Sequence, residues 1–201
     1  MSRIQQKTLR TVQLALLSAI IILLQQIVIP LPGGLTLSLV LVPIVVGALL
    51  FGPAAGAILG GVFGVVVTLL VITGRAGELS TMMWIANPAL TALICLLKGI
   101  AAGWVAGLLP RLCKNNAWVG TVLAAAAAPV VNTGIFLLGM LTVFRGVMLD
   151  FADKLGMGSA SALYFAVVIL VGVNFIVEFT ANLILSPAIS AIVKNIRKTT
   201  R

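Results

Sequence analysis

A few polar side chains inside long apolar segments are the residues of this sequence that could do chemistry. Asn87, Thr91 and Lys98 follow one another at spacings of four and seven residues, which places all three on one face of a helix. A charge at the centre of a bilayer costs about 2.5–3.5 kcal/mol on insertion scales. We therefore expect this face to point into the interior of a helix bundle or towards water, where it could contact a ligand.

A second polar face is predicted near the C-terminus, where Asn174, Glu178 and Asn182 recur every four residues. Lys98 lies thirteen residues before the basic end of its segment, about 20 Å, and Glu178 lies sixteen residues before the end of its own, about 24 Å. Two interpretations stay open: an ion pair that ties two helices together, or a site in which Lys98 holds an anionic ligand. The ion pair is favoured, because an unpaired buried charge is the costlier state.

Two further candidate positions, Asn132 and Thr133, follow Pro129 in another apolar segment. A proline leaves a carbonyl one turn earlier without its helical donor, and Asn or Thr side chains either satisfy that group or point at a ligand. Both readings stay open. Phe136 and Trp84 are among the few aromatic residues expected towards the outer face. Trp84, beside a predicted helix end, is more typical of an interfacial anchor than of a stacking platform.

The composition excludes most enzyme classes. The 201 residues include no histidine, four Asp and Glu, and two cysteines whose spacing suggests neither a metal site nor a disulfide framework. No G-x-x-x-x-G-K-[ST] motif for nucleotide phosphates occurs in the sequence. Hydrophobic residues make up 61% and charged residues 8%, which is typical of an integral membrane protein. We expect no enzymatic activity, no metal and no cofactor.

The net charge of +9 comes from 13 Lys and Arg against 4 Asp and Glu. The basic residues lie at the ends of the apolar segments and form no stripe with aromatic residues, so we expect contacts with lipid headgroups and none with nucleic acid. With both termini on one side, nine basic residues lie on that side and three on the other. The positive-inside rule then predicts that both termini are cytoplasmic.

The apolar segments are near the 20 residues that a hydrocarbon core of about 30 Å requires. We expect an all-α, polytopic membrane protein in which residues 1–201 form a single six-helix bundle. The predicted spans are about 11–29, 37–51, 54–73, 84–109, 118–144 and 159–193. Three longer connections, 30–36, 74–83 and 145–158, would then lie outside. Glycines at four-residue spacing predict close helix packing within the chain, at Gly56, Gly60, Gly64, Gly99, Gly103 and Gly107.

Three segments together carry a family resemblance: ALLSA at 15–19, VPIVVGALLFGPAAG at 42–56 and GGVFG at 60–64. The chain resembles the substrate-binding S component of energy-coupling factor (ECF) vitamin transporters over essentially its whole length. The resemblance implies a six-helix bundle of the prokaryotic plasma membrane that binds a vitamin near its outer face, under the loop between its first two helices. It also implies partners, namely a membrane scaffold subunit and two ATP-binding cassette ATPases. The ATPases, and not this chain, would use ATP. The scaffold would meet the face of the first helix formed by Ala15, Ser18 and Ala19.

The vitamin itself is predicted from two short segments. Residues 34–38, which include Thr36, and the Asn132-Thr133 pair look most like the pantothenate branch, and a basic residue such as Lys98 would suit that anion. Another vitamin such as riboflavin or folate, and a self-sufficient small transporter or channel, are the alternatives. The predicted substrate-binding residues are Thr36, Trp84, Asn87, Thr91, Lys98, Asn132, Thr133, Phe136, Asn174 and Glu178.

Overall fold

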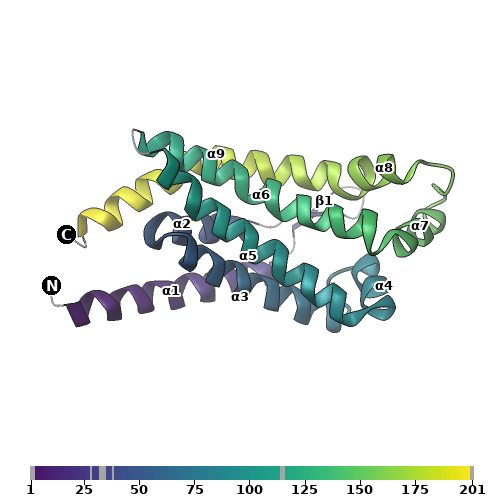
Figure 1. Ribbon diagram of the computed structural model, residues 1–201, viewed down its shortest axis with the longest axis horizontal. Helices are drawn as coiled ribbons and strands as arrows, with labels where there is room; N and C mark the ends of the chain where they lie inside the picture. Colours follow the sequence, from purple (N-terminus) through teal and green to yellow (C-terminus); the bar gives the residue numbers. More distant parts are fainter. Residues whose placement is uncertain (1–2, 28, 32–34, 38, 114–115, 200–201) are drawn as a thin grey trace.

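The computed structural model describes residues 3–27, 29–31, 35–37, 39–113 and 116–199. Its long helices lie side by side and form an elongated bundle (Figure 1). In chain order the elements are α1 (Arg3–Gln26), β1 (Ile29–Leu31), β2 (Leu35–Leu37), α2 (Leu41–Phe51), α3 (Pro53–Ile72), α4 (Glu78–Ala86), α5 (Pro88–Leu112), α6 (Ala117–Thr142), α7 (Arg145–Lys154), α8 (Ala162–Tyr164), the π-helical segment η1 (Phe165–Gly172) and α9 (Val173–Thr199).

The beginning of α1 and the end of α9 lie at the same end of the bundle, which we call the termini end (Figure 1). The short helices α4 and α7 lie at the opposite end, which we call the far end (Figure 1). This arrangement agrees with a chain whose two termini are on one side of a membrane. Which side that is stays a prediction.

Five helices among the described residues are long and apolar enough to cross a membrane: Ile4–Gln26, Pro53–Ile72, Pro88–Leu112, Ala117–Thr142 and Phe175–Ile196. The predicted helical membrane bundle is confirmed to that extent, but six full spans are not. The second predicted span contains α2, which has 11 residues and is therefore about 16 Å long. That length is roughly half of a hydrocarbon core of ~30 Å. The helix ends at Phe51 and is followed by Gly52, whose φ of +90° suits glycine, and α3 begins at Pro53.

The fourth predicted span is divided into α4 and α5 at Asn87. This residue has an extended backbone (φ −158°, ψ 97°), and its side chain accepts a hydrogen bond from the Leu90 amide at 3.0 Å. A residue before proline avoids helical geometry, and Pro88 is suited to the first helical position. The Asn-Pro pair therefore ends one helix and caps the next, and Trp84 belongs to the short helix α4 rather than to a span.

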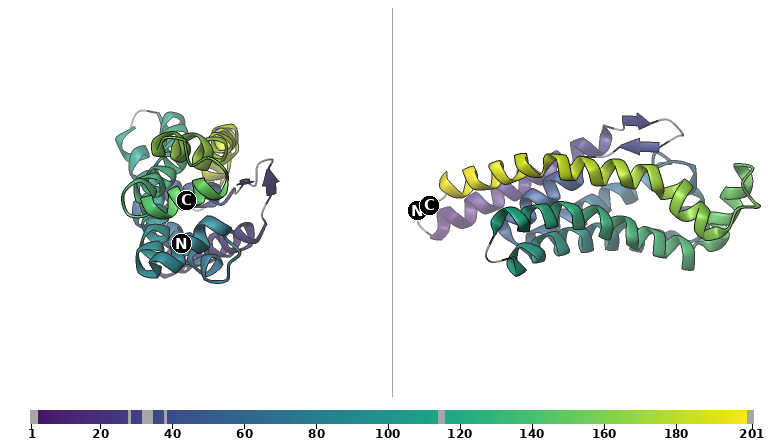
Figure 2. Two further views of the ribbon diagram at one scale, coloured as in Figure 1. Left: turned by 90° about the vertical axis from the view of Figure 1, so that its right-hand side faces the viewer. Right: turned by 90° about the horizontal axis from the view of Figure 1, so that it is seen from above.

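Two connections that the sequence predicted as loops contain regular structure. Part of 30–36 belongs to a two-stranded antiparallel hairpin in which Ile29 pairs with Leu37 and Pro30 with Thr36. The hairpin projects from one side of the bundle (Figure 2), and β2 lies against α9. The connection at 145–158 contains α7, whose buried residues Met148 and Ala152 pack in an apolar cluster with Met83 and Phe165.

The predicted glycine packing is confirmed between α3 and α5. A Cβ atom added to Gly60 would collide with the carbonyl oxygen of Gly99, and one added to Gly56 would collide with that of Gly103. The two backbones therefore touch, an approach that only small residues allow within a membrane. This contact fixes α5, and with it Lys98, against α3.

Candidate functional site

The amine of Lys98 lies between two aromatic rings from neighbouring helices. Its Nζ atom is 5.7 Å from the centroid of the Phe63 ring on α3 and 5.5 Å from that of the Phe136 ring on α6. An ammonium within about 6 Å of a ring face is attracted by the ring's negative potential. The two rings therefore compensate part of the desolvation of this charge inside the apolar bundle.

The ion pair that the sequence favoured between Lys98 and Glu178 is not formed. Among the residues that the structure describes, a charged pair within 4.0 Å is seen only between Lys154 and Glu78. The Lys98 amine instead faces the rings of Phe63 and Phe136. The physical reason is that aromatic rings on α3 and α6, two helices that pack against α5, attract the amine in place of the expected carboxylate.

Four polar side chains from three helices lie at nearly one depth. Depth is counted from a reference level on each helix. The reference residues line one cavity at the termini end and are Arg111 of α5, Ala117 of α6 and Lys194 of α9. Counted from these, Lys98 is thirteen residues away, Asn132 fifteen, Asn182 twelve and Glu178 sixteen. At 1.5 Å per residue the depths are about 20, 22, 18 and 24 Å. We call these four residues the polar layer.

Two buried oxygen atoms of the polar layer have no hydrogen-bond partner among the described residues. Asn182 is fully buried, and its Nδ2 donates to the backbone oxygen of Glu178 at 2.9 Å while its Oδ1 lacks a partner among the described residues. Asn132 is 9% exposed, and its Oδ1 likewise lacks one in that part of the chain. Buried polar groups are nearly always hydrogen-bonded. Both atoms can therefore accept a hydrogen bond from a bound molecule.

Asn87 and Thr91 do not belong to the polar layer, and their side chains make hydrogen bonds that stabilise the fold. The Thr91 hydroxyl is buried and contacts the carbonyl oxygens of Met83 and Asn87, each at 2.9 Å. The Asn87 side chain caps α5. Both side chains thus hold the break between α4 and α5, and their predicted role in substrate binding stays a prediction.

The remaining predicted site residues are spread over several elements. Phe136 and Thr133 lie on α6 and are half-buried, and Trp84 packs at the edge of an apolar cluster around Ile21. Thr36 lies in β2 and Asn174 in α9, but their side chains are outside the described part of the chain. Their predicted contacts with substrate therefore remain predictions.

The predicted partner surface on α1 is largely open. Ala15 and Ala19 are exposed, and Ser18 is half-buried with its hydroxyl donating to the Leu14 oxygen at 2.9 Å. Only 6% of the most apolar stretch of this helix is buried against the rest of the chain. Exposed neighbours such as Leu16 and Leu23 make this face apolar, so it suits lipid or another membrane helix.

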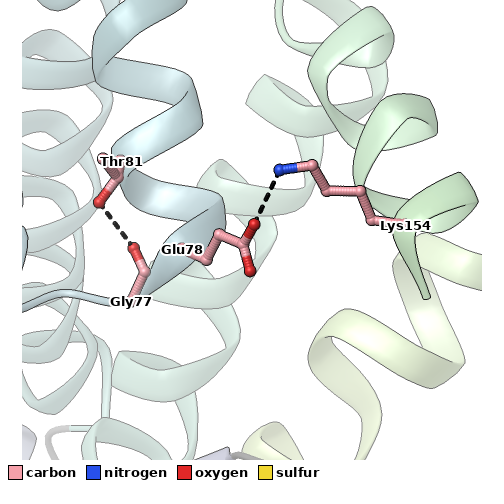
Figure 3. Close-up of polar contacts among 4 residues, drawn as sticks. All are labelled: Gly77, Glu78, Thr81 and Lys154. Atoms are coloured by element: carbon pink, nitrogen blue, oxygen red, sulfur yellow. Dashed lines mark hydrogen bonds and ion pairs between the residues drawn. The ribbon is translucent and has the colours of Figure 1, made fainter.

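Sequence reasoning missed two features that bear on the site. Phe63 was not predicted to contact Lys98, because nothing in a single sequence shows which faces of α3 and α5 meet around a given side chain. At the far end, Lys154 of α7 forms an ion pair with Glu78 of α4 at 2.8 Å (Figure 3). The two residues are 76 positions apart in sequence, and they meet because the predicted loop at 145–158 contains the helix α7.

The chain was compared with curated proteins and with models of protein families. A search of the curated proteins found no match to this chain. The family model described as "ECF transporter, substrate-specific component" matches residues 9–190. That range extends from α1 to the cavity-lining part of α9 and includes every member of the polar layer. The chain therefore belongs to the family of ECF transporter substrate-specific components.

Proposed function

We propose that this substrate-specific component binds a small carboxylate-bearing vitamin, with pantothenate as the first candidate. The observation that carries the proposal is the position of Lys98, whose amine lies between two rings with no carboxylate at ion-pair distance in the described residues. Lys98 is half-buried, and a charge inside an apolar bundle is stable only when it is compensated. Two rings supply part of that compensation, and the carboxylate of a substrate supplies more.

The neutral members of the polar layer favour a ligand with hydroxyl or amide donors. The Oδ1 atoms of Asn132 and Asn182 are buried acceptors without a partner among the described residues. Pantothenate carries one carboxylate, one amide N–H and two hydroxyl groups, which are complementary to one cation and two acceptors. A larger stacked ring system such as riboflavin fits less well, because the rings of Phe63 and Phe136 already face Lys98.

The same proposal includes the transporter that this subunit serves. We infer that α1 contacts a membrane scaffold subunit through the open face that includes Ala15, Ser18 and Ala19, and that two ATP-binding cassette ATPases drive uptake. The small side chains allow close approach of a partner helix. Both termini would lie in the cytoplasm of a prokaryotic cell, and the substrate would enter from the far end of the bundle.

Calorimetry on the purified protein tests the ligand class. Pantothenate, riboflavin and folate are each titrated into the wild type, Lys98→Met and the control Lys154→Met, whose lysine is exposed at the far end. We expect pantothenate to bind the wild type and the control and to bind Lys98→Met at least tenfold more weakly, since a charge-assisted contact contributes about 1.5–3 kcal/mol.

A thermal melt of each variant separates loss of binding from loss of the fold. If Lys98→Met melts far below the wild type, Lys98→Met combined with Glu178→Gln removes the opposite charge and is tested in its place. Tight binding of a neutral vitamin that ignores the Lys98 substitution would contradict the proposal. So would pantothenate transport by liposomes that contain this chain alone, since that result indicates a self-sufficient transporter.

A further inference from the structure

A cavity of about 460 Å³ lies at the termini end of the bundle, well away from the polar layer. It is lined by the end of α2, the turn into α3, the end of α5, the beginning of α6 and the C-terminal part of α9, and it opens to the surface, where Arg111 and Lys194 are exposed. Its volume falls within the range of about 300–1,000 Å³ that is usual for small-molecule sites. The residues that matter for its chemistry are Gly52, Arg111, Thr121, Ser190 and Lys194.

The cavity is strongly cationic. Arg111 and Lys194 both line it, and no Asp or Glu is found among its described lining residues. Two cations that share one cavity repel each other, and the repulsion is relieved when an anion lies between them. The arrangement therefore favours a negatively charged occupant.

The backbone makes room for the guanidinium of Arg111. Gly52, in the turn between α2 and α3, has φ of +90°, and a Cβ atom added there would lie 2.5 Å from Nη2 of Arg111. Any larger residue at this position would push the guanidinium away. A planar guanidinium with this space beside it can donate two parallel hydrogen bonds to one anionic group.

Two buried hydroxyl side chains also line the cavity, Thr121 of α6 at 4% exposure and Ser190 of α9 at 7%. The Thr121 hydroxyl donates to the Ala117 backbone oxygen at 3.0 Å, so the Ser190 hydroxyl is the better donor to an anion. The first-turn amides of α6 at Trp118 and Val119 are already capped by Asn116 at 3.0 and 3.3 Å. Side chains, and not a free helix end, would therefore bind the anion.

We propose that this cavity binds a phosphate group, carried either by an anionic phospholipid headgroup or by a small soluble phosphate compound. Arginine and lysine together with hydroxyl groups are the side chains that recognise phosphate. Basic pockets between transmembrane helices are also known receptors for lipid headgroups. The site is separate from the polar layer by about 18–24 Å along the helices, so it does not depend on the proposed vitamin substrate.

Native mass spectrometry of the full-length protein tests the proposal. The protein is released from nanodiscs that contain equal amounts of phosphatidylglycerol and phosphatidylcholine, and the retained lipid is weighed. The variant Arg111→Gln with Lys194→Gln is compared with a control of equal charge, Arg75→Gln with Arg145→Gln, whose exposed arginines lie outside the cavity. A parallel thermal melt compares inorganic phosphate and glycerol 3-phosphate with chloride at equal ionic strength.

The two arms distinguish the sources of phosphate. Selective retention of one phosphatidylglycerol, at least tenfold weaker in the cavity variant and unchanged in the control, assigns the cavity to a lipid headgroup. A melting temperature raised by the soluble phosphates in the wild type and the control, but not in the cavity variant, assigns it to a soluble phosphate compound. Equal behaviour of the cavity variant and the control in both arms overturns the proposal. A third variant, Gly52→Ala, keeps every charge and should weaken the same binding by displacing Arg111, provided that its melt shows a folded protein.

Discussion

The amine of Lys98 lies 5.5 Å from the centre of the Phe136 ring, so that a charge on α5 is held by an aromatic side chain on α6. The ring of Phe63 on α3 faces the same amine at 5.7 Å. These contacts join the close-packed α3 and α5 pair to a third helix. They also place the amine at the depth of the two buried amide oxygens that lack partners in the described chain.

The first prediction concerns the energy of this contact. Phe136→Leu should destabilise the protein by about 1–3 kcal/mol, because it leaves a smaller side chain and removes one ring from the amine. In a double-mutant cycle with Lys98→Met, we expect a coupling energy of about 0.5–2 kcal/mol. Denaturant titration in detergent measures all four proteins. Strict additivity would show that the ring and the amine do not interact.

The second prediction uses the buried amide of Asn182. Asn182→Leu removes the hydrogen bond to the Glu178 oxygen but also removes a buried acceptor that lacks a partner in the described chain. The two effects oppose each other, so the thermal stability of the ligand-free protein should change by less than about 1.5 kcal/mol. Affinity for the substrate should fall about tenfold, measured by calorimetry. A large loss of stability with unchanged affinity would instead assign Asn182 to the fold.

Much of this arrangement was predictable from the pattern of residue types. Hydropathy located the five long helices, and the four-residue glycine spacing predicted that α3 and α5 pack closely within the chain without identifying their partners, since both patterns are properties of a single helix. The Asn87-Pro88 pair is typical of a helix break, but the continuous hydropathy around it led to the prediction of one span over about 84–109. Contacts between helices were beyond reach, because the partner of Lys98 depends on how α3 and α6 are rotated. An aromatic ring was therefore missed where a carboxylate was expected.

The third prediction tests the backbone contact between α3 and α5 with adjacent glycines. Gly60→Ala should destabilise the protein by about 1–3 kcal/mol, because the new Cβ atom would collide with the Gly99 oxygen. Gly61→Ala is the matched control: its Cβ atom would meet Ile100 at 3.6 Å, an ordinary contact. That variant should be neutral or more stable by up to about 1 kcal/mol, since alanine favours a helix. Thermal melts in one detergent compare them, and equal effects would refute the predicted difference.

The fourth prediction concerns the open face of α1. Replacement of Ala15 or Ala19 by Trp should leave substrate binding intact and abolish ATP-driven uptake, because a bulky ring prevents close approach of a partner helix. Leu138→Trp, at an exposed position on α6, is the control and should retain both activities. Calorimetry measures binding, and uptake is measured in liposomes that contain the complete transporter. Loss of binding together with uptake would indicate that the alanines pack within this chain.

The last prediction concerns the orientation of the bundle, which follows from nine basic residues on the side of the termini against three on the other. Cys95 and Cys113 are first replaced by alanine and serine, since both are free thiols that could react. A single cysteine is then introduced either at Ser159, exposed near the far end, or at Asn195, exposed near the termini end. A membrane-impermeant maleimide should label only the Ser159→Cys protein in intact cells, and both proteins after the cells are opened. Labelling of Asn195→Cys alone in intact cells would reverse the topology. The far end would then face the cytoplasm, and the proposed entry of an external substrate from that end would be wrong.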